Sequence, residues 1–128
     1  MNEEEIYAAV GDEGFTRLTA NFYRRVKKDD LIGKMYPSDD WEGSEERLRE
    51  FLLFRFAANP AYLKKRGHPR LRGRHMPFQI GVAERDRWME MMGAAADEEI
   101  ADEGARAALI AFFAQVADFM RNVPDELR

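Results

Sequence analysis

Cysteine is absent from this chain of 128 residues, and histidine occurs only twice, as His68 and His75. Without thiols the protein has no disulfides, no iron–sulfur cluster, no thiolate metal ligand and no cysteine nucleophile. No second histidine or carboxylate lies at a zinc-ligand spacing from His75, which disfavours a metal site built from several side chains. A cofactor that needs nitrogen ligation would therefore have one main point of attachment, His75.

Long apolar runs and an excess of positive charge are missing as well. No stretch is long enough to span a membrane, and the acidic start Met1–Ile6 does not resemble a secretory signal peptide. The formal net charge is -4, with 20 basic and 24 acidic side chains, which argues against nucleic-acid binding through bulk charge. We expect one domain, residues 1–128, in a cytoplasmic protein that binds neither membrane nor nucleic acid.

The apolar residues recur at helical spacing, and no segment alternates as a strand would. This pattern predicts an all-α fold. The first long helix is predicted to run to about Lys27, and Gly11 and Gly14 are predicted to separate it from a shorter leading helix. Its apolar face consists of Phe15, Leu18, Phe22 and Val26.

Three further helices follow from capping and stopping signals. Ser44 is the predicted N-cap of the second helix, which should end at Asn59-Pro60. A third is predicted to begin near Ala83, before an acidic loop at residues 97–104. The last has one apolar stripe, formed by Leu109, Phe112, Phe113, Val116, Phe119 and Met120.

His75 lies in an arginine-rich segment, residues 66–78, where two prolines leave room only for a short helix near residues 71–76. A lone histidine is more often structural than a ligand. However, the apolar neighbours Met76, Pro77 and Phe78 would form a dry wall beside the imidazole. One such imidazole is what haem iron requires, because the porphyrin supplies the in-plane ligands. His68 lies on the same segment and is poorly placed to be the opposite axial ligand, so we expect it at a polar edge.

Three polar aromatic side chains, Tyr23, Tyr36 and Trp88, could complete such a pocket. Each taken alone is an ordinary aromatic residue at the edge of a core. Together they offer two hydroxyls and one indole N–H, which could donate hydrogen bonds to a bound dioxygen.

Several motifs recur in a characteristic order along nearly the whole chain. The most specific is Arg66-Gly-His-Pro-Arg-Leu-Arg-Gly-Arg-His-Met-Pro-Phe78. The others are Tyr7-Ala-Ala-Val-Gly11, Phe22-Tyr23, Met35-Tyr36-Pro37, Glu45-Glu-Arg-Leu-Arg-Glu-Phe-Leu52, Tyr62 and Glu84-Arg-Asp-Arg-Trp88. In this combination the chain resembles the group II truncated haemoglobins.

The resemblance implies a shortened globin fold, a two-over-two helical sandwich around one haem b (iron protoporphyrin IX). It implies that His75 is the proximal iron ligand. It implies a distal set of Tyr23, Tyr36 and Trp88, with Ser44 and Leu48 on the distal helix. It also implies cofactor contacts from Phe51, Leu52, Tyr62, Arg66, His68, Leu71, Arg72, Phe78 and Met92, some of them with the propionates.

The chain departs from the family pattern in one long stretch and at two single positions. Residues Phe54–Pro60 replace a Gln-Tyr-Trp-Gly-Gly-Pro run, Asp12 replaces a glycine, and Gly73 stands where methionine is common. Because the lost glycines adopt positive φ at little cost, their replacement predicts a longer distal helix.

The leading functional hypothesis is a haem protein, with a role such as oxygen transport, that binds dioxygen and other diatomic ligands and releases them slowly. The same haem could instead serve a redox enzyme, either a nitric oxide dioxygenase or a peroxidase-like enzyme. The sequence contains no flavin or nicotinamide domain, so an enzyme would need an external reductase. A haem-free helical interaction module is a third possibility. Expected small ligands are dioxygen, nitric oxide, carbon monoxide and peroxide, and the expected assembly is a monomer or a homodimer.

Overall fold

The structure, a computed structural model, describes residues 1–68, 75 and 78–122. Its regular elements are α1 (Glu3–Val26), a short 3-10 helix (Gly33–Met35), α2 (Trp41–Ala57), α3 (Ala61–Arg66), α5 (Val82–Glu99) and α6 (Glu103–Met120). No strand occurs among the described residues, which confirms the predicted all-α class. None of the helices in this part of the chain is both long and apolar enough to cross a bilayer.

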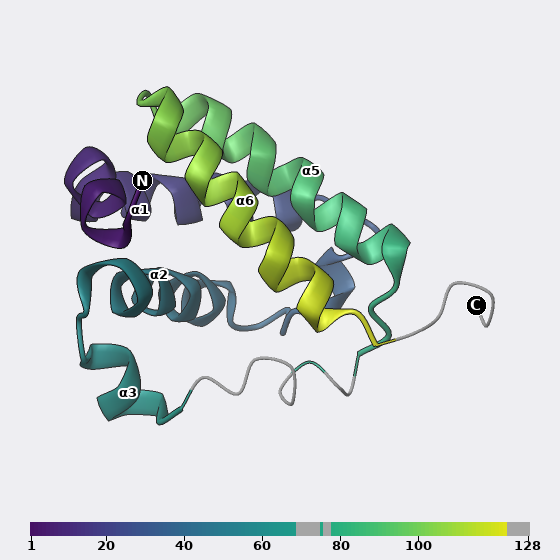
Figure 1. The fold of residues 1–128 in the computed structure, drawn as a ribbon. Helices are drawn as coiled ribbons and strands as arrows, with labels where there is room; N and C mark the ends of the chain where they lie inside the picture. Colours follow the sequence, from purple (N-terminus) through teal and green to yellow (C-terminus); the bar gives the residue numbers. More distant parts are fainter. Residues whose placement is uncertain (69–74, 76–77, 123–128) are drawn as a thin grey trace.

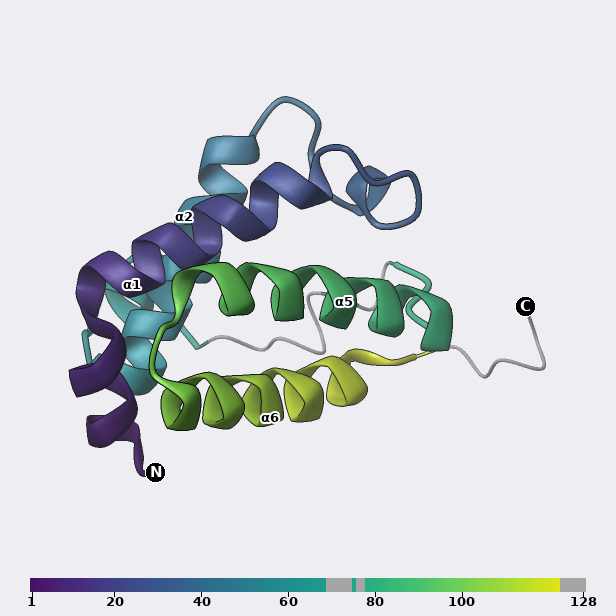
Figure 2. The ribbon, with the colours of Figure 1, turned by 90° about the horizontal axis from the view of Figure 1, so that it is seen from above.

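Four long helices form two stacked pairs. α1 and α2 make one pair, and α5 and α6 lie side by side and antiparallel as the other (Figure 1 and Figure 2). The core fills the space between the pairs, because each helix turns its apolar stripe inward. Its most completely buried large side chains include Phe15, Leu18, Phe22, Leu52, Met92, Leu109 and Phe113.

α1 contains one of the two predicted breaks. Gly11 has a φ of 70°, a left-handed conformation that glycine adopts at little cost, and it kinks the helix there. Gly14 does not break the helix. It is buried within it, and a Cβ at this position would lie 2.7 Å from the Cγ1 atom of Val10. A close contact inside α1 therefore explains this glycine.

α2 begins earlier than predicted. Its N-cap is Asp40, whose side chain accepts a hydrogen bond from the Gly43 N–H at 3.0 Å. The prediction that Ser44 is the cap was wrong, because Asp40 occupies the capping position one turn before it. α2 ends at Ala57, before Asn59-Pro60 as predicted. Ala58 takes a left-handed conformation with a φ of 53°, so the helix stops there although no glycine is present.

The later elements differ from prediction in three places. The six-residue helix α3 was not predicted. The acidic loop is shorter than expected, because α5 continues to Glu99 and Asp102 already caps α6 through the Ala105 N–H. Phe119 was wrongly placed in the apolar stripe of α6 and is 62% exposed. The predicted short helix near residues 71–76 lies, except for His75, outside the described residues.

Candidate functional site

A cavity of about 370 Å³ is lined by the helices and by His75, Phe78 and Ile80, which lie between α3 and α5 in the sequence. This volume is in the range of small-molecule and cofactor sites. The lining is mostly apolar and aromatic, and residues from α1, α2, α3, α5 and α6 contribute to it. Among the described residues no group of three or more histidine, aspartate or glutamate side chains is placed so that it could hold a metal ion.

Most of the predicted site residues line this cavity. They are Tyr23, Tyr36, Ser44, Leu48, Phe51, Tyr62, His75, Phe78 and Trp88. They come from positions far apart in the sequence, and the fold brings them to one enclosed space. His75, which is half-buried, is the only histidine among the described residues of the lining.

Four predicted cofactor contacts lie elsewhere in this structure. Leu52 and Met92 are completely buried in the helical core and do not line the cavity. Arg66 binds carboxylates of α2, and His68 is exposed. The remaining two, Leu71 and Arg72, lie outside the described residues.

Tyr23, Tyr36 and Trp88 form one side of the cavity, which we call the aromatic wall. The rings of Tyr23 and Tyr36 meet edge to face with centroids 5.4 Å apart. Trp88 packs against Phe22 at 5.0 Å and Phe113 at 5.5 Å. These contacts with the core fix the direction of the indole and both phenol rings.

The polar ends of the aromatic wall are connected to one another. Burial raises the pKa of the Tyr36 hydroxyl, and hydrogen bonds from Trp88 and Tyr23 oppose this rise. Burial, the nearby Tyr36 oxygen and the hydrogen bond to it raise the pKa of Tyr23 well above its usual value. The indole N–H of Trp88 can only donate, so Tyr36 accepts this bond, whereas the hydroxyls of Tyr23 and Tyr36 can each donate or accept. The three polar groups thus form one connected set beside the cavity.

Asp29 anchors the connection that leads to the aromatic wall. Its carboxylate accepts hydrogen bonds from the N–H groups of Leu31 at 3.0 Å and Ile32 at 2.8 Å, and it pairs with Arg87 of α5. Burial alone would raise the pKa of Asp29, but these bonds lower it below its usual value. Since Arg87 precedes Trp88, this ion pair fixes the approach to Tyr36 against α5.

His75, Phe78 and Ile80 form another part of the lining, which we call the histidine wall. Ile80 is buried, whereas Phe78 is 39% exposed. Arg85 lines the cavity as well, and its guanidinium pairs with Asp118 of α6 at 3.0 Å.

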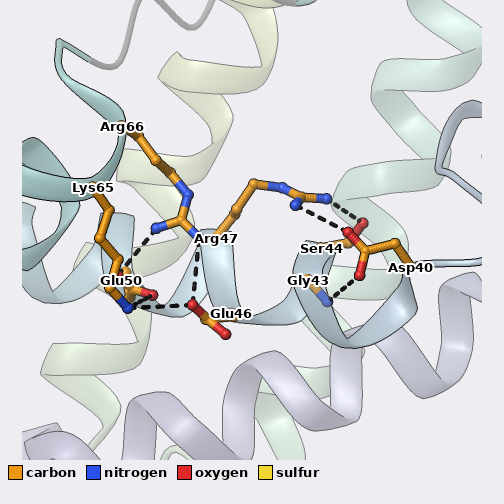
Figure 3. Close-up of polar contacts among 8 residues, drawn as sticks. All are labelled: Asp40, Gly43, Ser44, Glu46, Arg47, Glu50, Lys65 and Arg66. Atoms are coloured by element: carbon orange, nitrogen blue, oxygen red, sulfur yellow. Dashed lines mark hydrogen bonds and ion pairs between the residues drawn. The ribbon is translucent and has the colours of Figure 1, made fainter.

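Charged side chains of α2 form hydrogen bonds and ion pairs with one another and with α3 (Figure 3). Arg47 lines the cavity and binds Asp40 at 3.3 Å and the Ser44 oxygen at 3.0 Å. Arg47 was not among the predicted site residues, although its spacing of three residues from Ser44 places these two side chains on one face of α2. The roles of Asn122, Asp29 and Arg85 were not predicted either, because each of these residues binds a partner far away in the sequence.

A second charged group joins α2 to α3. Arg66 binds Glu50 at 3.1 Å and Glu46 at 3.4 Å, and Lys65 reaches the same two carboxylates at 3.2 and 3.4 Å (Figure 3). The Arg66 guanidinium also lies over the Tyr62 ring at 5.8 Å. Arg66 is thus engaged with the protein's own carboxylates.

Comparison with known proteins agrees with this architecture. The bacterial-like globin family matches residues 5–122. A thermostable haemoglobin from Thermobifida fusca is 43% identical, with 94% of this chain and 98% of that chain covered and a TM-score of 0.88. The group 2 truncated haemoglobin YjbI of Bacillus subtilis is 36% identical over 71% of this chain and 68% of that protein. The structure of a truncated oxygen-avid haemoglobin from Bacillus subtilis is 32% identical, with 91% and 98% covered and a TM-score of 0.85.

Proposed function

We propose that this chain, which belongs to the bacterial-like globin family as a group II truncated haemoglobin, holds haem b through His75 and binds dioxygen and other diatomic ligands with slow release. The observation that carries the proposal is the composition of one cavity. A single half-buried imidazole and three aromatic hydrogen-bond donors line the same apolar space. The family supports a haem cofactor, while the individual roles of the residues are our assignment.

The residues present fit this cofactor. An apolar lining suits the flat macrocycle, and one imidazole supplies the axial nitrogen that haem iron takes from the protein. Arg47 and Arg85, the two guanidinium groups among the described residues of the lining, would pair with the cofactor's carboxylates. When bound, haem supplies an iron that takes diatomic ligands.

The polar groups of the aromatic wall would stabilise the bound ligand together. Tyr36 and Trp88 would donate hydrogen bonds to the ligand, and Tyr23 would support Tyr36 by bonding to its hydroxyl. A phenol that accepts hydrogen bonds becomes a stronger donor itself, because linked hydrogen bonds polarise one another. Charge-assisted hydrogen bonds contribute roughly 1.5–3 kcal/mol each, enough to slow ligand release by one or two orders of magnitude. The similar protein from Bacillus subtilis is described as oxygen-avid.

Absorption spectra of the full chain mixed with haem test the proposal directly. We expect a Soret band that is lost or strongly reduced in His75→Gly and returns when free imidazole is added. His68→Gly is the matched control, because His68 is exposed and does not line the cavity. An unchanged spectrum in His75→Gly would exclude His75 as the ligand.

A redox enzyme is the second candidate. Tyr23, Tyr36 and Trp41 form a continuous group of oxidisable rings, with Tyr36 and Trp41 centroids 5.8 Å apart. Such a group could supply electrons or protons during oxidation of nitric oxide or turnover of peroxide, provided that an external reductase restores them. Steady-state consumption of nitric oxide in the presence of a reducing system would distinguish this role from ligand storage.

A further inference from the structure

Asn122 lies just beyond the end of α6 and is hydrogen-bonded to residues that precede α5. Its side-chain Nδ2 group donates to the carbonyl oxygens of Phe78 at 2.8 Å and His75 at 3.3 Å. Its Oδ1 atom accepts from the Ile80 N–H at 2.9 Å, and its backbone N–H donates to the Ile80 carbonyl at 2.8 Å. One asparagine therefore binds the backbone of all three residues of the histidine wall.

These bonds hold the carbonyl group of His75. It also accepts a hydrogen bond from the Phe78 N–H at 3.0 Å. The His75 carbonyl is thus held by Phe78 and by Asn122, which lies just beyond the end of α6. A held carbonyl limits the direction in which the Cα–Cβ bond of His75 leaves the backbone, and so limits where its imidazole can lie.

Ending α6 does not require this side chain. The Arg121 N–H closes the last turn of α6 by donating to the Asp118 carbonyl at 3.2 Å. The described bonds of the Asn122 side chain all go to residues 75–80. Ile80 is buried, and α5 with Trp88 begins at Val82, so the same bonds also fix the start of that helix.

We propose that Asn122 is the positioning residue for His75, joining the histidine wall to the end of α6. The proposal rests on the proposed function, in which His75 ligates haem iron. Outer residues that orient a metal ligand typically change metal affinity by about 10–100-fold when replaced. Because Asn122 acts through the backbone of His75, we expect an effect near the lower limit, roughly tenfold faster loss of haem.

Two variants of Asn122 and one control separate positioning from general stability. Asn122→Ala removes the donor and the acceptor. Asn122→Asp keeps an acceptor for the Ile80 N–H but places a carboxylate oxygen against the His75 and Phe78 carbonyls. Asn21→Ala is the control, because Asn21 likewise joins distant parts of the chain through its side chain, which binds Glu98 and Glu99, but it does not touch the histidine wall.

The measurements are the iron–histidine stretching band of the ferrous, ligand-free protein and the rate of haem transfer to an excess of a haem-free acceptor protein. In both Asn122 variants we expect the band to shift to lower frequency and broaden, and haem loss to be about tenfold faster. In Asn21→Ala the band should stay in place even if the melting temperature falls. An unchanged band in both Asn122 variants, with haem loss no faster than in the control, would overturn the proposal. A parent protein without an iron–histidine band would instead overturn the proposed function.

Discussion

The aromatic wall and the histidine wall line the same cavity but are held in place by different forces. The aromatic wall is fixed by packing, since its rings lie against Phe22 and Phe113 in the core. The histidine wall is fixed by hydrogen bonds to Asn122, and neighbouring α3 is joined to α2 by ion pairs. Changes in side-chain volume should therefore disturb the aromatic wall most. Changes in polarity, pH or salt should instead disturb the histidine wall and the neighbouring α3.

The magnitudes differ accordingly. Burial of a large apolar side chain contributes about 1.5–3 kcal/mol, with roughly 0.5–1.5 kcal/mol more for a well-placed aromatic pair. A neutral hydrogen bond contributes about 1 kcal/mol, and an exposed ion pair between 0 and about 1 kcal/mol. Because packing stabilises the aromatic wall strongly, its polar groups can change without loss of the fold. We therefore expect differences in ligand affinity among related proteins to come from these polar groups.

The largest effect is expected for Trp88→Phe. The phenyl ring preserves most of the contact with Phe22 and Phe113, but the indole N–H, a proposed hydrogen-bond donor to the ligand, is lost. Stopped-flow displacement of dioxygen should show release faster by about 10–100-fold. Trp41→Phe is the control, because Trp41 contacts the Tyr36 ring without lining the cavity. An unchanged rate in Trp88→Phe would remove the indole from ligand stabilisation.

A smaller effect, on stability and its pH dependence, is expected for Asp29→Asn. At neutral pH the variant should lose about 1.5 kcal/mol of unfolding free energy, because bonds to a charged carboxylate become bonds to an amide. Since the pKa of Asp29 is lowered in the folded protein, its contribution is complete above the usual aspartate pKa and disappears as the pH falls below about 4.

Denaturant titrations at pH 7 and pH 3 would measure the difference in unfolding free energy between the parent protein and Asp29→Asn. This difference should be smaller at pH 3. Asp30→Asn is the matched control, because the neighbouring Asp30 carboxylate is 98% exposed and lies 3.7 Å from the same Arg87. A loss at pH 7 as large in Asp30→Asn would show that Asp29 has no special role.

Glu50→Gln tests the ion pairs beside the histidine wall. Glu50 is 10% exposed and binds both Lys65 and Arg66, so we expect a loss of about 1 kcal/mol at low salt that decreases in 1 M salt. Thermal melts at two salt concentrations measure it. Glu45→Gln, which loses an arginine partner at 4.0 Å, should be silent. Equal losses of stability in Glu50→Gln and Glu45→Gln would show that the ion pairs of Glu50 contribute no more than that of Glu45.

The smallest effect should be a gain. Ala58→Gly, at the joint between α2 and α3, relieves the left-handed conformation but adds freedom to the unfolded chain, for a net stabilisation of about 0.5 kcal/mol. The same change at exposed Ala111 inside α6 should destabilise by roughly 1 kcal/mol. Loss of stability in Ala58→Gly would show that the cost of positive φ is already relieved at this joint.

Local patterns predicted the long helices and most of the residues that meet at the cavity. Helical spacing of apolar residues identified α1, α2, α5 and α6, because burial of one face dominates helix formation in proteins. The predicted cap at Ser44 was wrong because aspartate and serine are both good N-cap residues, and only the tertiary fold selects between Asp40 and Ser44. The predicted burial of Phe119 was wrong because spacing cannot show which of two adjacent stripes of a helix faces the core.

Features that depend on distant partners could not be predicted. The end of α5 looked like an acidic loop, but Asn21 of α1 binds Glu98 and Glu99 across the interface. The role of Asn122 depends on a residue 47 positions away. No local rule links such pairs, because they exist only once the helices have packed.

The 47 positions that separate His75 from Asn122 also affect the order of events during synthesis. A ribosome adding about 5–20 residues per second delivers the chain from His75 to Asn122 over roughly 2–9 s, since 47 positions separate them. Throughout that interval the His75 backbone lacks its hydrogen bond from Asn122. On the proposed function, secure binding of haem is therefore expected only after α6 and Asn122 have emerged from the ribosome.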